Sequence, residues 1–287
     1  MLLATWLLLV GRAAAFESDY LSVKAEGQGP DIVLIHGLAC SPEVWSGLAK
    51  EIGPRHRLHL VQVAGFAGSP APKVAPESYL KTIRDEITRY IDTEKLNKPI
   101  LIGHSMGGLI SLLVASNAES KVSNVIVVDA LPFFGLMFNP LATSEQVLPQ
   151  AMAIEKQMAE LDDASFEERA KSTASIFTKS DEKKELLLQW SKACDRKLYA
   201  TYLREIMSYD ARPELKNITC PVVVLHAYDP AMRIPETQLK QLYTNSYADL
   251  KKVTITTVPD SFHFIMWDQP KSFYEAVKEA LAPASAP

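Results

Sequence analysis

Cysteine and excess charge of one sign, which identify several large classes of proteins, are both scarce in this sequence of 287 residues. The three cysteines, Cys40, Cys194 and Cys220, form no C-x-x-C pair, which argues against a disulfide scaffold and a structural zinc site. A formal charge of −4 and a pI near 5.9 argue against a surface built to bind nucleic acid. With 47% hydrophobic residues, the chain is too apolar to be disordered throughout. These absences leave an ordinary globular protein.

Cofactor motifs and long hydrophobic runs are also missing. There is no P-loop, dinucleotide fingerprint or H-E-x-x-H, so neither a metal site nor an organic cofactor is predicted. The longest uncharged apolar run near the start, Leu2–Val10, is much shorter than the about 20 residues that a membrane-spanning helix needs. The rest of the chain has no hydrophobic run long enough to span a membrane either, so no transmembrane anchor is predicted.

The apolar run at the start fits the core of a secretory signal. Ala13–Ala15 supplies the small residues that precede a cleavage site, so residues 1–15 are expected to be a signal peptide and the protein to be periplasmic or secreted. Arg12 lies on the wrong side of the run for a standard signal, and a simple hydrophobic extension or anchor is the alternative. Without a working signal the protein would be cytoplasmic. Export would permit one disulfide and one free thiol, although three buried thiols are the preferred interpretation.

The remaining sequence alternates short apolar runs with segments of helical periodicity. Runs that are apolar throughout are typical of parallel strands covered on both faces, so an α/β fold with a mostly parallel central sheet and helices on both faces is predicted. Tyr20–Ala25 is expected to add an antiparallel edge. The predicted strands are 32–35, 59–63, 99–102, 124–128, 221–225 and 253–258. The predicted helices between and after them are 42–52, 78–96, 105–115 and 273–281.

The alternation stops between the fourth and fifth of these strands. Residues 132–208 contain helical runs at 144–161, 165–177 and 181–207 and no strand-like segment. This stretch is predicted to be a helical cap inserted over the strand ends. The catalytic core would then comprise residues 16–131 and 209–287.

The clearest chemical motif is Gly103-His104-Ser105-Met106-Gly107, which fits G-x-S-x-G. It follows a predicted buried strand and opens a predicted helix. Glycines on both sides permit the tight strand–turn–helix corner that exposes a serine hydroxyl at the sheet edge. Ser105 is therefore the predicted nucleophile.

With this motif the chain resembles the capped members of the α/β-hydrolase fold superfamily, from about Tyr20 to Leu281. The sequence segments from Gly27 to Gly37 and from Asp210 to Leu225 are similar to that family as well. The resemblance implies that His263, in the loop after the last strand, is the general base. It also implies an acid after a strand end. Asp229 is the preferred residue, because it lies at the family's usual position, and Asp129 is the reserve.

The resemblance also implies an oxyanion hole made by the backbone N–H groups of Leu38 and Met106. Gly37 would allow the close approach, and His36 would brace the loop through side-chain hydrogen bonds. The loop after the second strand departs from the family pattern, because the acidic and basic residues common in relatives are missing from 62–68. His104 is interpreted as a packing residue.

A serine in this motif argues against the dehalogenase and epoxide-hydrolase reactions of the fold, which use a carboxylate nucleophile. The predicted function is hydrolysis of small to medium, largely apolar carboxylic esters through an acyl-serine intermediate. Phe133, Phe134 and Phe138 either line the acyl pocket or join the cap to the core. Two alternatives remain: a reaction of the same triad on a thioester, peroxyacid, amide or C–C bond, and a binding protein without catalysis. A small-molecule ester is the predicted partner, and the sequence makes no prediction of oligomeric state.

Overall fold

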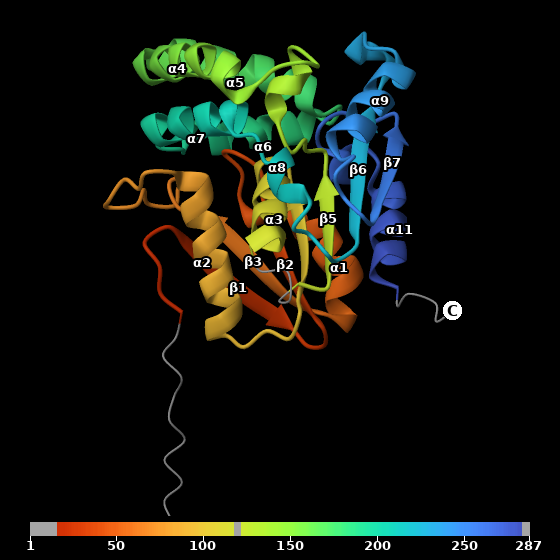
Figure 1. The fold of residues 1–287 in the computed structure, drawn as a ribbon. Helices are drawn as coiled ribbons and strands as arrows, with labels where there is room; N and C mark the ends of the chain where they lie inside the picture. Colours follow the sequence, from red (N-terminus) through yellow and green to blue (C-terminus); the bar gives the residue numbers. More distant parts are fainter. Residues whose placement is uncertain (1–15, 118–121, 283–287) are drawn as a thin grey trace, which may run out of the picture.

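The fold is built on one seven-stranded sheet with strand order β1-β3-β2-β4-β5-β6-β7 (Figure 1). The computed structural model describes residues 16–117 and 122–282, so the predicted signal peptide lies outside the described residues. The strands are β1 (Leu21–Gly27), β2 (Asp31–Ile35), β3 (Arg57–Val63), β4 (Ile100–His104), β5 (Asn124–Val128), β6 (Val222–Tyr228) and β7 (Val253–Pro259).

Strand direction follows the prediction. β1 pairs with β3 in antiparallel register, from Leu21 opposite Val63 to Gly27 opposite Arg57. The other neighbouring pairs are parallel. The carboxyl ends of β2 to β7 therefore meet at one edge of the sheet, where ligands bind in open α/β sheets.

Successive residues of each central strand point to opposite faces, and both faces are covered. In β2, Ile32 and Leu34 belong to the apolar cluster on one face, whereas Val33 and Ile35 belong to the cluster on the other, and all four are fully buried. Helices α2 (Tyr79–Thr93), α3 (Met106–Asn117), α8 (Arg212–Leu215) and α9 (Glu236–Ser246) contribute to the second cluster. Helices α1 (Ser46–Ile52), α10 (Ile265–Asp268) and α11 (Pro270–Leu281) contribute to the first. This two-sided burial explains why the strands are apolar throughout.

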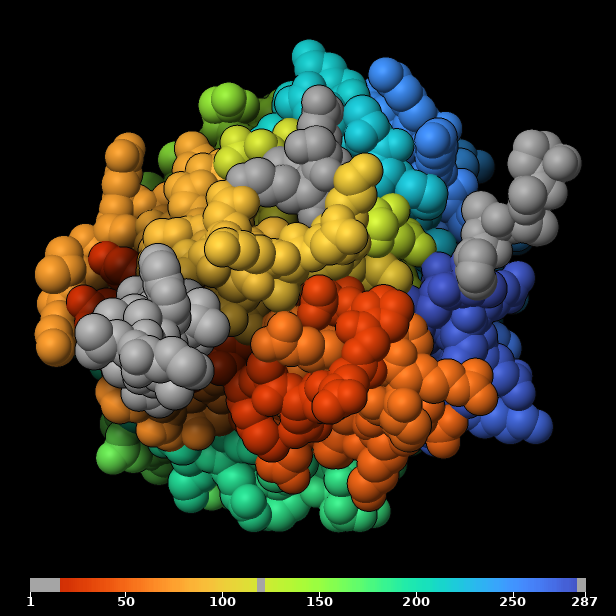
Figure 2. Space-filling view, turned by 90° about the horizontal axis from the view of Figure 1, so that it is seen from below, coloured from red at the N-terminus to blue at the C-terminus, as the bar shows by residue number. Residues whose placement is uncertain are grey.

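Residues 132–208 form a helical insertion between β5 and β6. It contains the short 3₁₀ helix η4 (Phe134–Met137) and helices α4 (Ser144–Glu160), α5 (Asp163–Phe177), α6 (Asp181–Lys192) and α7 (Arg196–Ser208). Figure 1 shows these four α-helices together beyond the end of the sheet toward which β5 and β7 point. Seen from the opposite end, the red, orange and yellow segments of the N-terminal part of the chain occupy the centre of the surface, and the green insertion reaches only the margin (Figure 2).

The single helix predicted for residues 181–207 is wrong, because the chain turns between α6 and α7. Asp195 accepts a hydrogen bond from the Leu198 N–H at 2.9 Å and so acts as the N-cap of α7. The backbone N–H of Asp195 donates to the Gly65 carbonyl at 2.9 Å, which holds this turn against the loop after β3. The break in the helix therefore makes a contact with the core.

A buried carboxylate joins the other end of α7 to the core. Glu205 is 5% exposed and accepts hydrogen bonds from the N–H groups of Tyr79 and Leu80 and from the hydroxyl of Ser78, at 2.8–3.0 Å. These groups lie at the start of α2, where a negative charge is stabilised by the unpaired N–H groups and the helix dipole.

Among the described helices, none is long and apolar enough to cross a membrane.

Candidate active site

The strand–turn–helix corner predicted around Ser105 is present between β4 and α3. Ser105 has a φ of +54°, a left-handed conformation that a side chain other than glycine rarely adopts. The flanking glycines are required by close packing: a Cβ on Gly103 would lie 2.1 Å from the Gly107 carbonyl oxygen, and one on Gly107 would lie 2.1 Å from that of Ile35. The corner exposes part of Ser105 at the carboxyl edge of the sheet.

Backbone hydrogen bonds place Ser105 beside the end of β5. The Ser105 N–H donates to the Val128 carbonyl at 2.9 Å, one residue before Asp129. Asp129 also has a left-handed conformation, with a φ of +46°, and its N–H donates to the Leu225 carbonyl at 2.7 Å. Two residues that can take part in chemistry therefore occupy strained turns at adjacent strand ends.

His263, in the loop after β7, is paired with Asp129. The distance between Nδ1 of His263 and Oδ2 of Asp129 is 2.7 Å. Since an ionised carboxylate can only accept, Nδ1 carries the proton and Nε2 is left free to accept one. The preferred pairing of His263 with Asp229 is therefore wrong, and the reserve residue Asp129 occupies that place.

The surroundings of Asp129 favour its charged form. Burial alone would raise its pKa, but the hydrogen bond and charge of His263 and the hydrogen bond from the Ala227 N–H together hold the pKa below its ordinary value of 3.8. Oδ1 accepts from the Ala227 N–H at 2.9 Å and from the Tyr243 hydroxyl at 3.1 Å. The carboxylate is thus oriented from three directions.

Asp229 contacts other groups than His263. Its carboxylate forms an ion pair with Nζ of Lys179 at 2.5 Å and accepts from the Ala231 N–H at 2.7 Å. The second contact caps the 3₁₀ helix η5 (Pro230–Met232). This is the behaviour of a turn aspartate that precedes a proline. The hydrogen bond and charge of Lys179 lower the pKa of Asp229.

His104 contacts His263 as well as packing in the core. Its Nε2 lies 3.0 Å from the carbonyl oxygen of His263, and the two imidazole centroids are 4.6 Å apart. The His104 ring is fully buried, and its Nδ1 has no hydrogen-bond partner within the described ranges. Burial and the nearby His263 keep the pKa of His104 well below 6.5, so it is the neutral ring that packs here.

The loop expected to form the oxyanion hole lies next to the nucleophile. A Cβ on Gly37 would lie 3.0 Å from Nδ1 of His104 and 3.2 Å from the Cβ of Ser105, so glycine keeps this approach free of crowding. The Cys40 N–H donates to the Gly37 carbonyl at 3.2 Å and closes the turn that contains Leu38. On the other side Met106 is the first residue of α3, and the first N–H groups of a helix have no acceptor within the helix.

His36 forms hydrogen bonds at the start of this loop. Its Nε2 accepts from the Val63 N–H at 3.0 Å, and its Nδ1 lies 2.7 Å from the Gly37 carbonyl oxygen. Burial lowers the pKa of His36 from 6.5 to about 4, so the ring is neutral at physiological pH. Gln62 supports the loop after β3 by donating to the Val63 and Phe66 carbonyls at 2.8 and 3.3 Å. The Gln62 side chain thus holds the loop after β3, which lacks the acidic and basic residues expected there from the resemblance.

The three phenylalanines predicted to line a pocket differ in environment. Phe133 is fully buried in a cluster with Leu136, Val147 and Met207, and its ring lies 5.1 Å from the Arg212 guanidinium. The buried members of this cluster lie within the insertion, and the Arg212 guanidinium is a group from outside the insertion that contacts this ring. Phe134 and Phe138 are 37% and 58% exposed and contact each other edge to face.

An aromatic ring that the sequence did not single out lies on His263. Phe177, the last residue of α5, has its ring centroid 4.6 Å from that of His263. Only the fold brings these residues together, because 85 residues separate them in the sequence and no motif contains both.

The thiols are free and do not form a metal site. Cys40 and Cys220 are buried as predicted, whereas Cys194 is half-buried, which the interpretation of three buried thiols missed. Burial raises the pKa of the Cys194 thiol to about 12, so it is protonated at neutral pH. Across residues 16–117 and 122–282, no three His, Cys, Asp or Glu side chains are grouped to hold a metal ion.

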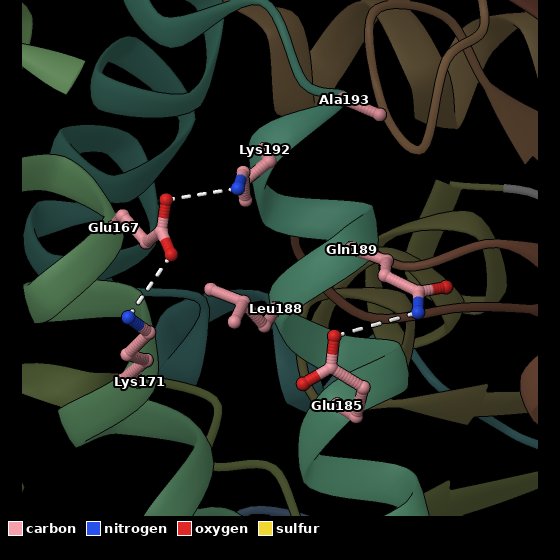
Figure 3. A pocket seen from close by; sticks show the side chains of 7 residues that line it. All are labelled: Glu167, Lys171, Glu185, Leu188, Gln189, Lys192 and Ala193. Carbon is pink, nitrogen blue, oxygen red and sulfur yellow. Dashed lines mark hydrogen bonds and ion pairs between the residues drawn. The ribbon is translucent and has the colours of Figure 1, made fainter. Parts of the chain in front are cut away.

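A groove of about 600 Å³ lies within the insertion and is shown in Figure 3. It runs between α5 and α6, where Glu167 forms ion pairs with Lys171 at 3.0 Å and Lys192 at 2.8 Å. No residue predicted for the catalytic site lines this groove.

A mostly parallel sheet flanked by helices, a strained serine corner and an adjacent His–Asp pair are the features of an α/β-hydrolase fold. A model of the Alpha/beta hydrolase family matches residues 32–276, and the chain belongs to this family.

Curated relatives match part of the chain. It is 34% identical over 114 residues to a pimeloyl-[acyl-carrier protein] methyl ester esterase of Aeromonas salmonicida, which is 40% of this chain and 43% of that protein. It is 32% identical over 151 residues to the Vibrio campbellii protein of the same name, covering 50% and 57%. The chain thus spans about half the length of the curated relatives it matches.

Solved structures resemble nearly the whole chain. An esterase from Exiguobacterium antarcticum superimposes with a TM-score of 0.75 at 20% identity, covering 91% of this chain and 96% of that one. An enol-lactonase from Burkholderia xenovorans gives a TM-score of 0.72 at 19% identity, covering 91% and 96%. At these identities the likeness concerns the fold.

Proposed function

We propose that this protein is a serine hydrolase that cleaves small to medium, largely apolar carboxylic esters through an acyl-serine intermediate. The observation that carries the proposal is the placement of Ser105 on a strained strand–helix corner beside the His263–Asp129 pair. A serine hydroxyl is a weak nucleophile, and a neighbouring imidazole that can accept its proton makes it reactive.

In the proposed reaction the Ser105 hydroxyl attacks the ester carbonyl carbon while Nε2 of His263 takes its proton. Asp129 holds the resulting imidazolium through the 2.7 Å contact to Nδ1. The N–H groups of Leu38 and Met106 would bind the oxyanion. Collapse of the tetrahedral intermediate releases the alcohol, which receives the proton from His263. Water then attacks the acyl-serine by the same route and releases the acid.

The comparisons favour an ester as the substrate. The relatives that match 40% and 50% of the chain are named as methyl ester esterases, and one of the structural neighbours is an esterase. An apolar substrate is favoured by the Phe177 ring, which lies beside the base with 4.6 Å between the ring centroids.

Labelling with a fluorophosphonate probe tests the nucleophile. The unmodified protein is expected to be labelled and Ser105→Ala to resist labelling. Ser116→Ala, which changes a serine in the helix that follows the corner, should be labelled normally. Hydrolysis of p-nitrophenyl esters of increasing chain length then tests the substrate class. A protein that is not labelled would contradict the serine mechanism. A labelled protein that turns over thioesters or amides but no oxygen ester would contradict the ester assignment.

A further inference from the structure

Both chain neighbours of His263 are held by hydrogen bonds of their backbone N–H groups, one to the end of helix α5 and the other to helix α10. The Phe264 N–H donates to the Phe177 carbonyl at 3.0 Å. On the other side, the Phe262 N–H donates to Oδ2 of Asp268 at 2.8 Å. The loop that carries the base is therefore held by groups from the insertion and from α10, outside the triad.

Asp268 connects this loop to the residues that follow α5. Its Oδ1 accepts from the hydroxyl of Thr178 at 2.6 Å and from the N–H of Lys179 at 2.9 Å. Thr178 is fully buried, so water cannot readily replace the hydroxyl in this contact. One carboxylate thus joins three donors, two of them from the chain after α5 and one from the residue before the base.

Two more contacts strengthen the same junction. The Phe177 ring lies against the His263 imidazole, with 4.6 Å between centroids. Lys179 forms the ion pair with Asp229 at the end of β6 and places its ammonium 5.5 Å from the centroid of the Phe262 ring. The aspartate that the sequence favoured as the catalytic acid therefore belongs to this junction.

We propose that Phe177, Thr178 and Asp268 form a positioning clasp that holds His263 in line between Asp129 and Ser105. The inference rests on the proposed function, because it concerns the base of that reaction. The clasp makes the insertion part of the catalytic geometry, in addition to any contact that it makes with substrate. None of its members needs to touch the reacting atoms. Small displacements of a base cost large factors in rate, so its loss should lower kcat more than it changes KM.

Thr178→Val tests the clasp, since valine keeps the shape of threonine and removes only the hydroxyl. We expect kcat on a p-nitrophenyl ester, and the rate of fluorophosphonate labelling, to fall about tenfold, with KM changed less than about twofold. Thr178→Ser retains the hydroxyl and should restore most of the rate. Asp268→Asn, at a partly exposed position, removes one of the accepting oxygens and should lower kcat at least as much.

Ser144→Ala is the matched control within the insertion. It removes a hydroxyl that donates to the Ser208 carbonyl at 2.5 Å and joins α4 to α7, away from His263. Its kcat should stay within about twofold of the unmodified protein, and thermal melting should show every variant folded at the assay temperature. Full activity of Thr178→Val and Asp268→Asn, or an equal loss in Ser144→Ala, would overturn the clasp. Absence of labelling in the unmodified protein would instead refute the proposed function.

Discussion

Two residues that carry chemistry, Ser105 and Asp129, have left-handed backbone conformations. Each such conformation costs about 1–3 kcal/mol for a residue other than glycine, so the surrounding structure must hold it in place. The hydrogen bonds from Ser105 to Val128 and from Asp129 to Leu225 do so, because they extend the pairing of β4, β5 and β6 into the turns. Both residues are thereby fixed at the carboxyl edge of the sheet, at the ends of neighbouring strands.

Comparison of Asp129→Asn with Asp229→Asn identifies the acid at the level of single residues. An amide at position 129 no longer fixes the Nδ1–H tautomer of His263 or stabilises its imidazolium, so kcat should fall on the order of 10³–10⁴-fold. Asp229→Asn loses only the ion pair to Lys179. Because the N–H of Lys179 also bonds to Asp268 of the clasp, kcat should decrease by no more than about tenfold. Steady-state hydrolysis of a p-nitrophenyl ester measures both. A larger loss in Asp229→Asn would contradict the assignment of Asp129.

The sequence could not choose between these two aspartates. Both follow the end of a parallel strand, and both fit the order serine, aspartate, histidine along the chain. The choice depends on how far the loop after β7 reaches across the sheet, which the strand spacing and the clasp determine. In contrast, Ser105 could be predicted, because the strand–helix turn that carries it requires a glycine on each side. Both glycines belong to one short motif that can be recognised in the sequence.

At the scale of elements, local apolar patterns predicted the sheet well. The strand Asn124–Val128 has the predicted limits, and the predicted antiparallel edge is the strand Leu21–Gly27. Helix α9 (Glu236–Ser246) was not predicted, since it buries only a few side chains and its apolar pattern is weak. The break between α6 and α7 was missed because it depends on a single capping residue, Asp195.

Close packing at Gly103, in β4 against α3, and open space at Gly53, after α1, predict opposite results for two glycine substitutions. Gly103→Ala would place a Cβ 2.1 Å from the Gly107 carbonyl oxygen, which is backbone and cannot move aside, so the free energy of unfolding should fall by about 3 kcal/mol or more. Gly53→Ala meets nothing closer than a Leu58 methyl at 3.5 Å, has a φ of −55°, and should gain about 0.5 kcal/mol. Urea unfolding measures both, and equal stability of the two variants would disprove the packing argument.

At the scale of the whole molecule, four fully buried histidines make stability depend on pH. Burial lowers the pKa values of His36, His59, His104 and His226 in the folded protein. In the unfolded chain they titrate near 6.5, so below that pH the unfolded state binds more protons than the folded one. The free energy of unfolding should therefore be greatest above pH 6.5 and decrease as the pH falls.

His36 provides the quantitative case, because its folded pKa is about 4. Between pH 7.5 and 4.5 this one ring should lower the free energy of unfolding by about 2.5 kcal/mol. His36→Gln retains groups that can hydrogen-bond to Val63 and Gly37 but does not titrate, so its stability should decrease less over the same range by about that amount. The other three histidines affect both proteins equally and cancel in the difference. Denaturant unfolding at several pH values gives the two curves, and parallel curves would show that His36 is not held neutral by the fold.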